Sequence, residues 1–310
     1  MLESRPKLLI AESEDSYLSA LCRSVLPTTI RVIHSEKLLI DEFSDVNIIL
    51  GAPDRLADWL PYLPKLEWIQ STWAGVKPLV LAQRHDYVLT GLKGVFGQAM
   101  SEYVLGWLLA LERQILTYAA DVSWNQRPLC SVQGKQVGIM GTGDIGRAVA
   151  STLSNMGMVC RGFNQSGEVF PEFQTCFSGS NMRDFACGLD YLVCLMPDTP
   201  KTQDLVSRDL LMALDSDAIL INAGRGNCID ELDLLWVLDQ GHLRYCVLDV
   251  FRQEPLPQSH PFWSHPQVYV TSHTSAPTDP AGAVRVFEMN LTRFLNGESL
   301  LYAIDFEKGY

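Results

Sequence analysis

The sequence contains no long uninterrupted run of apolar residues. Across its 310 residues, no window approaches the roughly 18 consecutive apolar residues of a membrane-spanning helix. The first residues, M-L-E-S-R-P-K, do not have the basic and then apolar pattern of a secretion signal. These absences predict a cytoplasmic protein with no membrane partner.

Basic residues are scarce. The chain has 24 Lys and Arg against 36 Asp and Glu, a formal net charge of −12 at pH 7. This excess of acidic charge argues against a general surface for nucleic acid or anionic lipid, although a single cationic pocket for a small anion stays compatible with it. We expect no nucleic-acid partner.

The cysteines form no C-x-x-C pair and no metal-ligand spacing, so we expect no metal site. The eight cysteines are Cys22, Cys130, Cys160, Cys176, Cys187, Cys194, Cys228 and Cys246. Most are expected to be buried as small apolar side chains, above all Cys194 and Cys246, which lie in apparent buried strands. The chain also has no internal repeat and no low-complexity tract.

The length of the chain suits about two domains of ~100 to 200 residues each. Short apolar runs at residues 8–11, 46–50 and 66–70 alternate with helical patterns near 17–25 and 56–63. This alternation predicts a small α/β unit. From residue 99 a long periodic stretch predicts a helix that links this unit to the next.

A glycine motif opens the second part of the chain. Residues 137–146 read V-G-I-M-G-T-G-D-I-G. In such a motif Gly141 permits a tight turn, Gly143 lets the backbone approach a pyrophosphate, and Gly146 lets the following helix pack closely. Alone the motif is a weak signal, but an apparent strand at 135–140, a helix ending before Gly157 and a strand at 158–163 supply the βαβ unit that it requires. We therefore expect a dinucleotide at the helix N-terminus.

Six apolar strand candidates follow one another at intervals of 22 to 32 residues, which leaves room for a crossover helix in most gaps. They start near Val137, Val159, Tyr191, Ala218, Cys246 and Val268. The pattern predicts a doubly wound, mostly parallel Rossmann-type sheet. The final helix, 281–295, lies beyond the last strand and is placed to return to the first domain.

Three side chains with coherent chemistry stand just past predicted strands, where doubly wound sheets bind ligands. Arg225 offers a planar fork for a carboxylate and polarises the adjacent carbonyl oxygen. His273 is the natural proton donor to that oxygen, and Glu254 would orient its ring and favour the imidazolium. Singly, each is more often a surface or structural residue. Together they predict reduction of a 2-keto acid to a 2-hydroxy acid.

Seven segments carry a resemblance to a known family. They are S-T-W-A-G-V at 71–76, S-E-Y-V-L at 101–105, G-T-G-D-I-G at 141–146, L-M-P-D-T-P-K-T at 195–202, N-A-G-R-G at 222–226, L-D-V-F-R-Q-E-P-L-P at 248–257 and T-S-H-T at 271–274. In this order the chain resembles the D-isomer-specific 2-hydroxyacid dehydrogenases, in particular the glyoxylate and hydroxypyruvate reductase branch.

The resemblance implies a discontinuous, flavodoxin-like substrate domain, residues 1–98 and 276–310, beside a dinucleotide-binding domain, residues 99–275. It implies a homodimer with the helix near Ser101 at the interface. Backbone N–H groups of Trp73, Ala74, Gly75 and Val76 would bind the substrate carboxylate, together with Arg225. The implied cofactor contacts are Gly141, Thr142, Gly143, Asp144, Ile145, Gly146, Asn164, Gln165, Ser166, Met196, Pro197, Thr202, Ala223, Arg225 and Asp249, the last near the nicotinamide carboxamide.

Two positions depart from the family pattern. Ser272 precedes the histidine where relatives usually have proline. Asn164, followed by Gln165 and Ser166, stands where NAD-dependent relatives carry an acid for the ribose 2′-hydroxyl. No carboxylate repels a 2′-phosphate here, so we expect a preference for NADP(H), with NAD(H) left open. The preference is expected to be modest, because NADP-using relatives often place arginine at the Gln165 position, and Arg161 is a poor substitute if its side chain points into the sheet.

The expected function is therefore NADPH-dependent reduction of a small 2-keto acid, such as glyoxylate or hydroxypyruvate, to the D-2-hydroxy acid. The alternative is a dinucleotide-sensing, corepressor-like binding protein on the same fold without turnover. Formate or phosphite oxidation is a third hypothesis, and Glu254 argues against it because formate enzymes of this type normally carry glutamine there.

Overall fold

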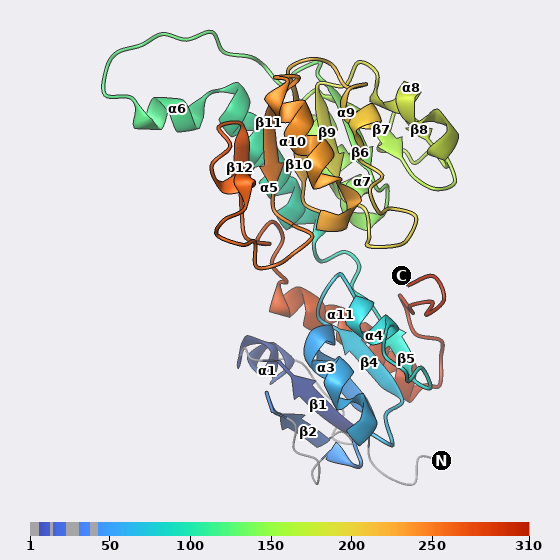
Figure 1. Cartoon of the computed structure of the whole chain (residues 1–310). Coiled ribbons are helices and arrows are strands. Elements are labelled where there is room, and N and C mark those ends of the chain that lie inside the picture. Colours follow the sequence, from blue (N-terminus) through green and yellow to red (C-terminus); the bar gives the residue numbers. More distant parts are fainter. Residues whose placement is uncertain (1–5, 13–14, 23–30, 38–42, 310) are drawn as a thin grey trace. The chain divides into compact units, whose positions relative to one another are not determined.

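The chain folds into two compact units, each built on its own parallel sheet (Figure 1). The computed structural model describes residues 6–12, 15–22, 31–37 and 43–309. The first unit comprises Met1–Phe96 and Thr278–Tyr310, and the second comprises Gly97–Pro277. The predicted α/β class, with a Rossmann-type sheet and a smaller α/β sheet, is confirmed.

The sheet of the first unit has the strand order β2-β1-β3-β4-β5, with every pair parallel. Its strands are β1 (Lys7–Ala11), β2 (Arg31–His34), β3 (Ile48–Gly51), β4 (Trp68–Ser71) and β5 (Val88–Thr90). Its helices are α1 (Asp15–Cys22), α3 (Pro53–Trp59), the 3-10 turn η1 (Leu60–Tyr62), α4 (Lys77–Val80) and α11 (Pro280–Leu295). Helices cover the sheet, so β1, β3 and β4 are buried along their whole length.

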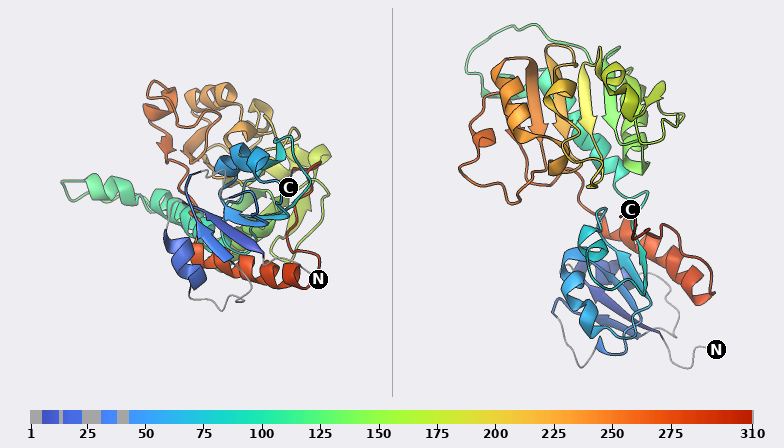
Figure 2. Two further views of the ribbon diagram at one scale, coloured as in Figure 1. Left: turned by 90° about the horizontal axis from the view of Figure 1, so that it is seen from below. Right: turned by 45° about the vertical axis from the view of Figure 1, so that its right-hand side comes forward.

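The C-terminal helix α11 packs on the sheet of the first unit (Figure 2). The buried Asn290 donates through Nδ2 to Oε1 of Gln70 on β4 at 3.1 Å, and its Oδ1 accepts the N–H of Leu301 at 2.7 Å. The ring of Trp68, also on β4, stacks on Phe287 of α11 with centroids 5.1 Å apart. Two distant parts of the sequence thus form one folded unit.

The second unit has the strand order β12-β11-β10-β9-β6-β7-β8, again with every pair parallel. Its strands are β6 (Gln136–Met140), β7 (Val159–Phe163), β8 (Thr175–Phe177), β9 (Tyr191–Cys194), β10 (Ala218–Asn222), β11 (Leu243–Leu248) and β12 (Val268–Val270). Its helices are α5 (Gly97–Glu112), α6 (Ile115–Ala120), α7 (Asp144–Asn155), α8 (Met182–Ala186), α9 (Arg208–Leu211) and α10 (Glu231–Asp239), with the 3-10 turns η2 (Gly179–Asn181), η3 (Gly226–Cys228) and η4 (Pro261–Trp263).

The order of the second sheet reverses between β6 and β9. In open parallel sheets this reversal opens a ligand crevice at the carboxyl ends of the two strands. Successive strand residues alternate between two hydrophobic layers, as Leu192 and Val193 of β9 do. One layer packs against α8, α9 and α10, and the other against α5 and α7. The core therefore holds the strands rigidly and leaves their carboxyl ends to carry the site.

Helix α5 is anchored at both ends by hydrogen bonds. Near its C-terminus the buried Glu112 accepts the hydroxyl of Tyr191 at 2.7 Å and forms an ion pair with Arg244. Near its N-terminal half the Tyr103 hydroxyl lies 2.8 Å from Oγ1 of Thr271, just after β12. Burial raises the pKa of the Tyr103 hydroxyl, so it stays a neutral hydrogen-bonding group.

Three strands, β2, β5 and β8, are missing from the sequence prediction. Strands β5 and β8 have three residues each, which is too short to show a period of two. Strand β8 also falls in the longest interval between the predicted strands and lies at the edge of its sheet. The other strands, and the five helices for which a position was expected (α1, α3, α5, α7 and α11), lie within a few residues of it, although residues 23–25 of the first predicted helix lie outside the described residues.

The cysteine prediction is largely correct. Cys160, Cys194, Cys228 and Cys246 are buried, whereas Cys130 and Cys187 are exposed; the side chain of Cys22 lies outside the described part. Within the described ranges, no cluster of three or more His, Cys, Asp or Glu side chains is arranged to hold a metal ion. None of the described helices combines the length and the apolar character needed to cross a bilayer.

Candidate active site

The glycine turn after β6 has the geometry of a nucleotide-binding turn. Gly141 has φ +104°, and a Cβ there would lie 2.7 Å from the carbonyl oxygen of Leu195. A Cβ on Gly146 would lie 1.9 Å from the carbonyl oxygen of Gly141, so only glycine lets α7 start this close to the sheet. By contrast, a Cβ on Gly143 would meet no atom within 4 Å. The turn thus leaves open space above Gly143 at the N-terminus of α7, which fits a pyrophosphate.

Asn164 organises the loop after β7. Its Nδ2 donates to Oγ1 of Thr142 at 2.9 Å and to the carbonyl of Glu168 at 2.8 Å. Its Oδ1 accepts the N–H of Gly167 at 2.6 Å and the hydroxyl of Ser166 at 3.1 Å. The amide expected to face the ribose is therefore used within the loop, and the neighbouring Gln165 and Ser166 are the exposed polar groups.

Arg161 does not contribute to this loop. Its guanidinium donates to the carbonyl of Cys187 at 2.8 Å and to Oε1 of Gln136 at 3.2 Å. Gln136 is the first residue of β6, so Arg161 extends toward the amino ends of the strands. The expectation that Arg161 cannot replace a cation beside Gln165 agrees with this position.

The loop after β9 lies against the turn. Met196 is buried, and Oγ1 of Thr202 donates to the carbonyl of Pro197 at 2.7 Å. A Cβ on Gly224 would lie 2.9 Å from the backbone nitrogen of Met196. The loops after β9 and β10 are therefore in direct contact. Ala223, which precedes Gly224, is buried, and its N–H donates to the carbonyl of Cys194 of β9 at 3.2 Å.

Arg225 stands on the loop after β10. Asn222 shapes this loop because its Nδ2 donates to the carbonyl of Arg225 at 3.1 Å and its Oδ1 accepts the N–H of Gly224 at 3.2 Å. The Arg225 guanidinium donates one hydrogen bond, from Nη1, to the carbonyl of Gly224 at 2.6 Å. Burial lowers its pKa, while the carboxylates of Asp198 and Glu254 act in the opposite direction. Arg225 thus remains a cation with further N–H donors.

Asp249, at the end of β11, binds the loop that carries the histidine. Its carboxylate, fully buried, accepts the hydroxyl of Thr271 and the N–H groups of Thr274 and Ser275 at 2.9 and 3.0 Å. Its carbonyl accepts the N–H of His273 at 2.8 Å. The contact expected between Asp249 and the nicotinamide carboxamide stays a prediction; the contacts observed are those that shape residues 271–275.

His273 and Glu254 form a direct pair. Nδ1 of His273 lies 2.8 Å from Oε2 of Glu254, whose other oxygen accepts the N–H of Phe251 at 2.9 Å. Because the carboxylate accepts at Nδ1, the opposite ring nitrogen Nε2 is the one left to face a ligand. About half of the His273 side chain is exposed. The structure therefore brings Glu254 and His273 together and places Glu254 within electrostatic reach of Arg225.

In the first unit, Thr72 anchors the loop expected to bind a carboxylate. Its N–H donates to the carbonyl of Gly51 at 3.2 Å, its hydroxyl donates to the buried Glu12, and its carbonyl accepts the hydroxyl of Thr278 at 2.8 Å. The next N–H, that of Trp73, already donates to Oγ of Ser71 at 3.0 Å.

Three further N–H groups follow in this loop. Those of Ala74, Gly75 and Val76 donate to no acceptor within the described residues. Four N–H groups were expected to bind the substrate carboxylate. These three have no acceptor among the described residues and are able to donate to a ligand. The indole of Trp73 is 42% exposed.

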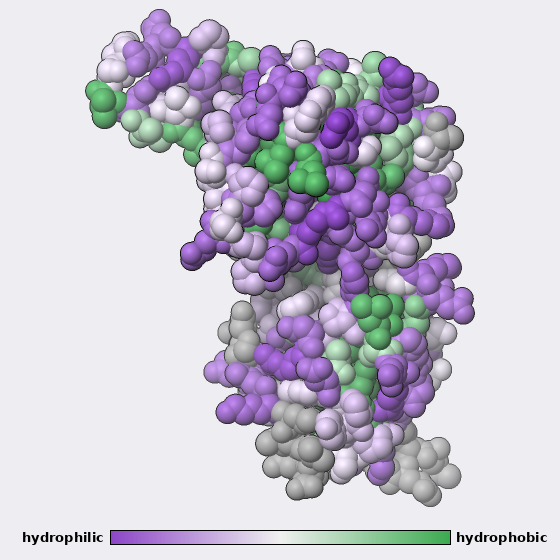
Figure 3. All heavy atoms as spheres, in the orientation of Figure 1, coloured by the Kyte–Doolittle hydropathy of each residue, from purple (hydrophilic) through white to green (hydrophobic). Residues whose placement is uncertain are grey.

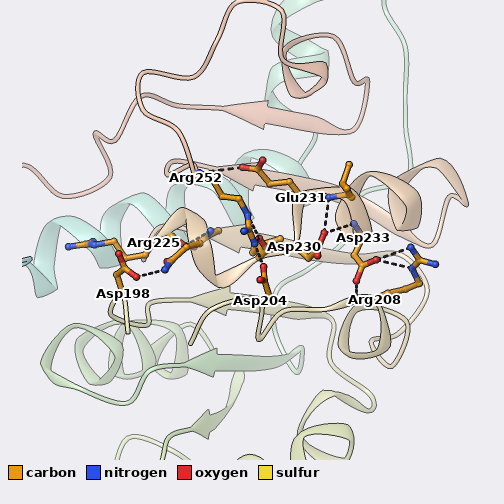
Figure 4. A network of polar contacts seen from close by, with 12 residues as sticks. Asp198, Asp204, Arg208, Arg225, Asp230, Glu231, Asp233 and Arg252 are labelled. Atoms are coloured by element: carbon orange, nitrogen blue, oxygen red, sulfur yellow. Dashed lines mark hydrogen bonds and ion pairs between the residues drawn. The ribbon is translucent and has the colours of Figure 1, made fainter. Parts of the chain in front are cut away.

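Sequence reasoning missed several side chains that connect the loops of the second unit (Figure 4). Asn227 donates to Asp198, and Arg252 donates to Asp204 and to the carbonyl of Ile229. Asp198 and Arg252 lie inside two of the segments that carry the family resemblance, which is the only signal that pointed to them. Their partners are remote in sequence and cannot be read from local spacing.

The class of protein follows from these features. A parallel sheet with a glycine turn that fits a dinucleotide, and a histidine paired with an acid that is within electrostatic reach of an arginine, are typical of a nicotinamide-dependent oxidoreductase. A family model described as "D-isomer specific 2-hydroxyacid dehydrogenase, NAD binding domain" matches residues 105–275. The chain belongs to the D-isomer specific 2-hydroxyacid dehydrogenase family, as the sequence resemblance indicated.

Curated relatives and solved structures agree. The chain is 34% identical over 217 residues to glyoxylate/hydroxypyruvate reductase A of Photorhabdus laumondii, which covers 69% of each chain. A family member from Aeromonas salmonicida has a TM-score of 0.92 at 34% identity, covering 98% of this chain and all of that one. The NADPH-dependent glyoxylate/hydroxypyruvate reductase of Sinorhizobium meliloti, solved with NADP and sulfate, has a TM-score of 0.88 at 28% identity over 98% of this chain and all of that one.

The two glycines of the turn give a matched pair of substitutions. We predict that Gly143→Ala leaves the free energy of unfolding unchanged within about 0.5 kcal/mol, because the new methyl group enters open space, yet weakens NADPH binding about 10-fold or more by occupying the pyrophosphate site. Gly146→Ala forces α7 away from Gly141 and is expected to lower the unfolding free energy by about 1–3 kcal/mol. Urea unfolding and fluorescence titration with NADPH measure both; equal NADPH affinity in Gly143→Ala and the wild type would contradict the assignment.

Proposed function

We propose that this protein reduces a small 2-keto acid of the glyoxylate or hydroxypyruvate type to the D-2-hydroxy acid, using NADPH in preference to NADH. The observation that carries the proposal is the contact of 2.8 Å between His273 and Glu254, with the partly buried Arg225 within electrostatic reach of Glu254. All three residues follow carboxyl ends of strands in the sheet that bears the glycine turn. This edge is where such sheets bind their ligands.

His273 is the proton donor in this proposal. Glu254 accepts at Nδ1, which fixes the ring and leaves Nε2 to face the keto acid. Nε2 then gives its proton to the carbonyl oxygen of the keto acid as negative charge develops there. When bound, the nicotinamide supplies the hydride. Glu254 keeps the ring in this orientation through its contact with Nδ1.

Arg225 holds the keto acid. Its guanidinium has N–H donors left after the single bond to Gly224, and a planar fork suits a carboxylate. A cation next to the carbonyl also polarises that bond and stabilises charge on its oxygen. For the first unit by itself, we propose that the N–H groups of Ala74, Gly75 and Val76 are able to bind a carboxylate, supported by their lack of acceptors in the described part of the chain.

The preference for NADP(H) rests on two points. The S. meliloti reductase was solved with NADP, and a family member from Xanthobacter autotrophicus, 27% identical, was solved with NADPH. In this chain the residue after β7 is Asn164, which carries no charge to repel a 2′-phosphate. Because the exposed neighbours Gln165 and Ser166 are neutral, we infer that NADH is also accepted.

The enzyme is favoured over a dinucleotide sensor. A protein that only binds the nucleotide needs no proton donor held by an acid, and the curated relatives are named reductases. Glu254 likewise disfavours formate oxidation, since the expected residue for that reaction is glutamine. The cytoplasmic location stays a prediction.

The activity has a direct test. Purified protein mixed with NADPH and glyoxylate, hydroxypyruvate or pyruvate should oxidise the cofactor, followed at its absorbance band, and NADH should support a slower reaction. His273→Asn, which tolerates the positive φ of this position, should reduce kcat by about 10²–10⁴ and leave NADPH affinity nearly unchanged.

A second histidine serves as the matched control. His265 also lies beside an acid, Asp239 at 3.6 Å, but on the segment before β12. His265→Asn should retain wild-type kcat. If the wild type binds NADPH and turns over none of the keto acids with either cofactor, the reductase assignment is wrong and the sensor is favoured.

We also propose a homodimer, formed through the helix near Ser101, α5, together with residues 113–131 that follow it. In α6 no residue is buried, and the loop after it closes on the helix through Arg127, whose N–H donates to the Tyr118 hydroxyl at 2.9 Å and whose guanidinium pairs with Asp121. Figure 3 shows apolar surface on this segment. The exposed apolar side chains are Ile115, Leu116, Val122, Trp124 and Leu129. A segment ordered by its own polar contacts that exposes this much apolar surface suits a second copy of the chain.

Two aspartates test the dimer. The double substitution Val122→Asp and Trp124→Asp should convert a dimer to a monomer in size-exclusion chromatography with light scattering, because both side chains are almost fully exposed in one chain and charges are costly in an interface core. Leu232→Asp, an exposed apolar position on α10, is the control and should remain dimeric. A wild-type monomer, or a dimer that tolerates both aspartates, would contradict the proposed interface.

A further inference from the structure

Arg252 connects three loops that surround the proposed site (Figure 4). It lies two residues before Glu254, in the loop after β11. Its guanidinium forms an ion pair with Asp204 and donates to the carbonyl of Ile229 from Nη2 at 2.6 Å and from Nε at 3.1 Å. Its backbone N–H donates to Oε1 of Glu231 at 3.3 Å. One side chain thus holds segments that follow β9, β10 and β11.

The partners of Arg252 are themselves part of the loops that carry the site. Asp204 follows Thr202 in the loop after β9, and its N–H donates to the carbonyl of Asn227 at 2.9 Å. Val206 pairs with Ile229 in a parallel bridge. Ile229 in turn lies four residues after Arg225. The loop after β9 and the loop that carries Arg225 are therefore hydrogen-bonded to each other, and Arg252 connects the Glu254 loop to both.

The consequence for Glu254 is local. The residue before Arg252, Phe251, donates its N–H to Oε1 of Glu254 at 2.9 Å, which leaves Oε2 for Nδ1 of His273 at 2.8 Å. The bond between Phe251 and Glu254 closes this short segment. The side chain of Arg252, within the segment, is held by Asp204 and Ile229. Release of Arg252 frees the segment that sets the Glu254 carboxylate against the histidine.

We propose that Arg252 is a positioning residue for proton delivery: by binding Asp204 and Ile229 it fixes the Glu254 loop so that Glu254 orients His273. This inference rests on the proposed reductase function. Arg252 acts through Glu254 and touches neither substrate nor cofactor. The effect expected of its loss is on the rate of the proton-coupled step and not on cofactor affinity, since misplacement of a catalytic group by a fraction of an ångström slows the reaction.

The chain offers a matched control in Arg208. Its guanidinium donates to Asp233 from Nε and Nη2 at 3.1 and 2.8 Å, and it stacks over the ring of Trp236. It joins α9 to α10 in the same unit and appears in the same view (Figure 4). Its side chain is 46% exposed against 34% for Arg252. Loss of either arginine removes one ion pair of comparable exposure, but only Arg252 contacts the segment of Glu254.

The experiment compares Arg252→Ala, Arg252→Lys, Asp204→Asn and Arg208→Ala with the wild type, using glyoxylate and NADPH. We expect Arg252→Ala to lower kcat about 10-fold, to increase the solvent deuterium isotope effect on kcat, and to leave the NADPH dissociation constant within about 2-fold. Arg252→Lys keeps a cation for Asp204 and should recover part of kcat. Asp204→Asn removes the ion pair without shortening any side chain and should lower kcat about 3-fold. Arg208→Ala should match the wild type in kcat and isotope effect.

Thermal unfolding of all variants separates positioning from stability. If Arg252→Ala and Arg208→Ala have equal kcat, or if the isotope effect of Arg252→Ala is unchanged, the proposal is overturned. Should Arg252→Ala fail to fold, an unchanged kcat in Asp204→Asn overturns it equally. Wild-type protein that turns over no keto acid would instead overturn the reductase function itself, so the two failures are distinct.

Discussion

The geometry of the site depends on the hydrogen bonds that the buried carboxylate of Asp249 accepts. It collects a hydroxyl and two backbone N–H groups from residues 271–275. Between these contacts His273 has φ +55°, a conformation that few residues other than glycine adopt. A strained residue persists only where its surroundings determine it on several sides. Here the Asp249 carboxylate, with its several hydrogen-bond donors, holds His273 in this conformation. The histidine ring extends from the loop toward Glu254.

The other loops of the site are held in a similar way, because they follow rigid strands and polar side chains bind them. The hydrophobic layers fix β9, β10 and β11, and each following loop is then held by a polar side chain, as Asn222 holds the Arg225 loop. Glycines allow the loops to approach one another, since a Cβ on Gly226 would lie 1.9 Å from the backbone of Phe251. These contacts within the protein hold the loops in place, which limits the cost of organising the site during the reaction.

The sequence predicted the features that depend on local constraints. The turn at Gly141 and the close packing at Gly146 are present because the glycine spacing reflects backbone geometry, which is local. Arg225, Glu254 and His273 were proposed as site residues because parallel strands bring their carboxyl ends to one edge; the structure joins Glu254 to His273, and the catalytic roles of all three stay predictions. The family and the fold class were predicted correctly from the same segments.

What the sequence did not predict depends on tertiary contacts. The sequence shows that position 164 carries no acid. It does not show that the Asn164 amide makes its hydrogen bonds within its own loop and to Thr142. The same holds for the ion pair of Arg252 with Asp204, which are 48 positions apart. Short edge strands such as β8 have too few residues for a period. Asp249 was assigned to the nicotinamide from the family resemblance, whereas its contacts to the histidine loop required the fold.

The central claim is that Arg225 and Nε2 of His273 act on the same keto acid. It is tested most directly by a crystal structure of the protein with NADP⁺ and oxamate, an unreactive analogue of a 2-keto acid. The account predicts that Arg225 binds the oxamate carboxylate while Nε2 of His273 lies within about 3.2 Å of the neighbouring carbonyl oxygen. Oxamate bound away from both side chains, or His273 turned from Glu254 in the complex, would contradict it.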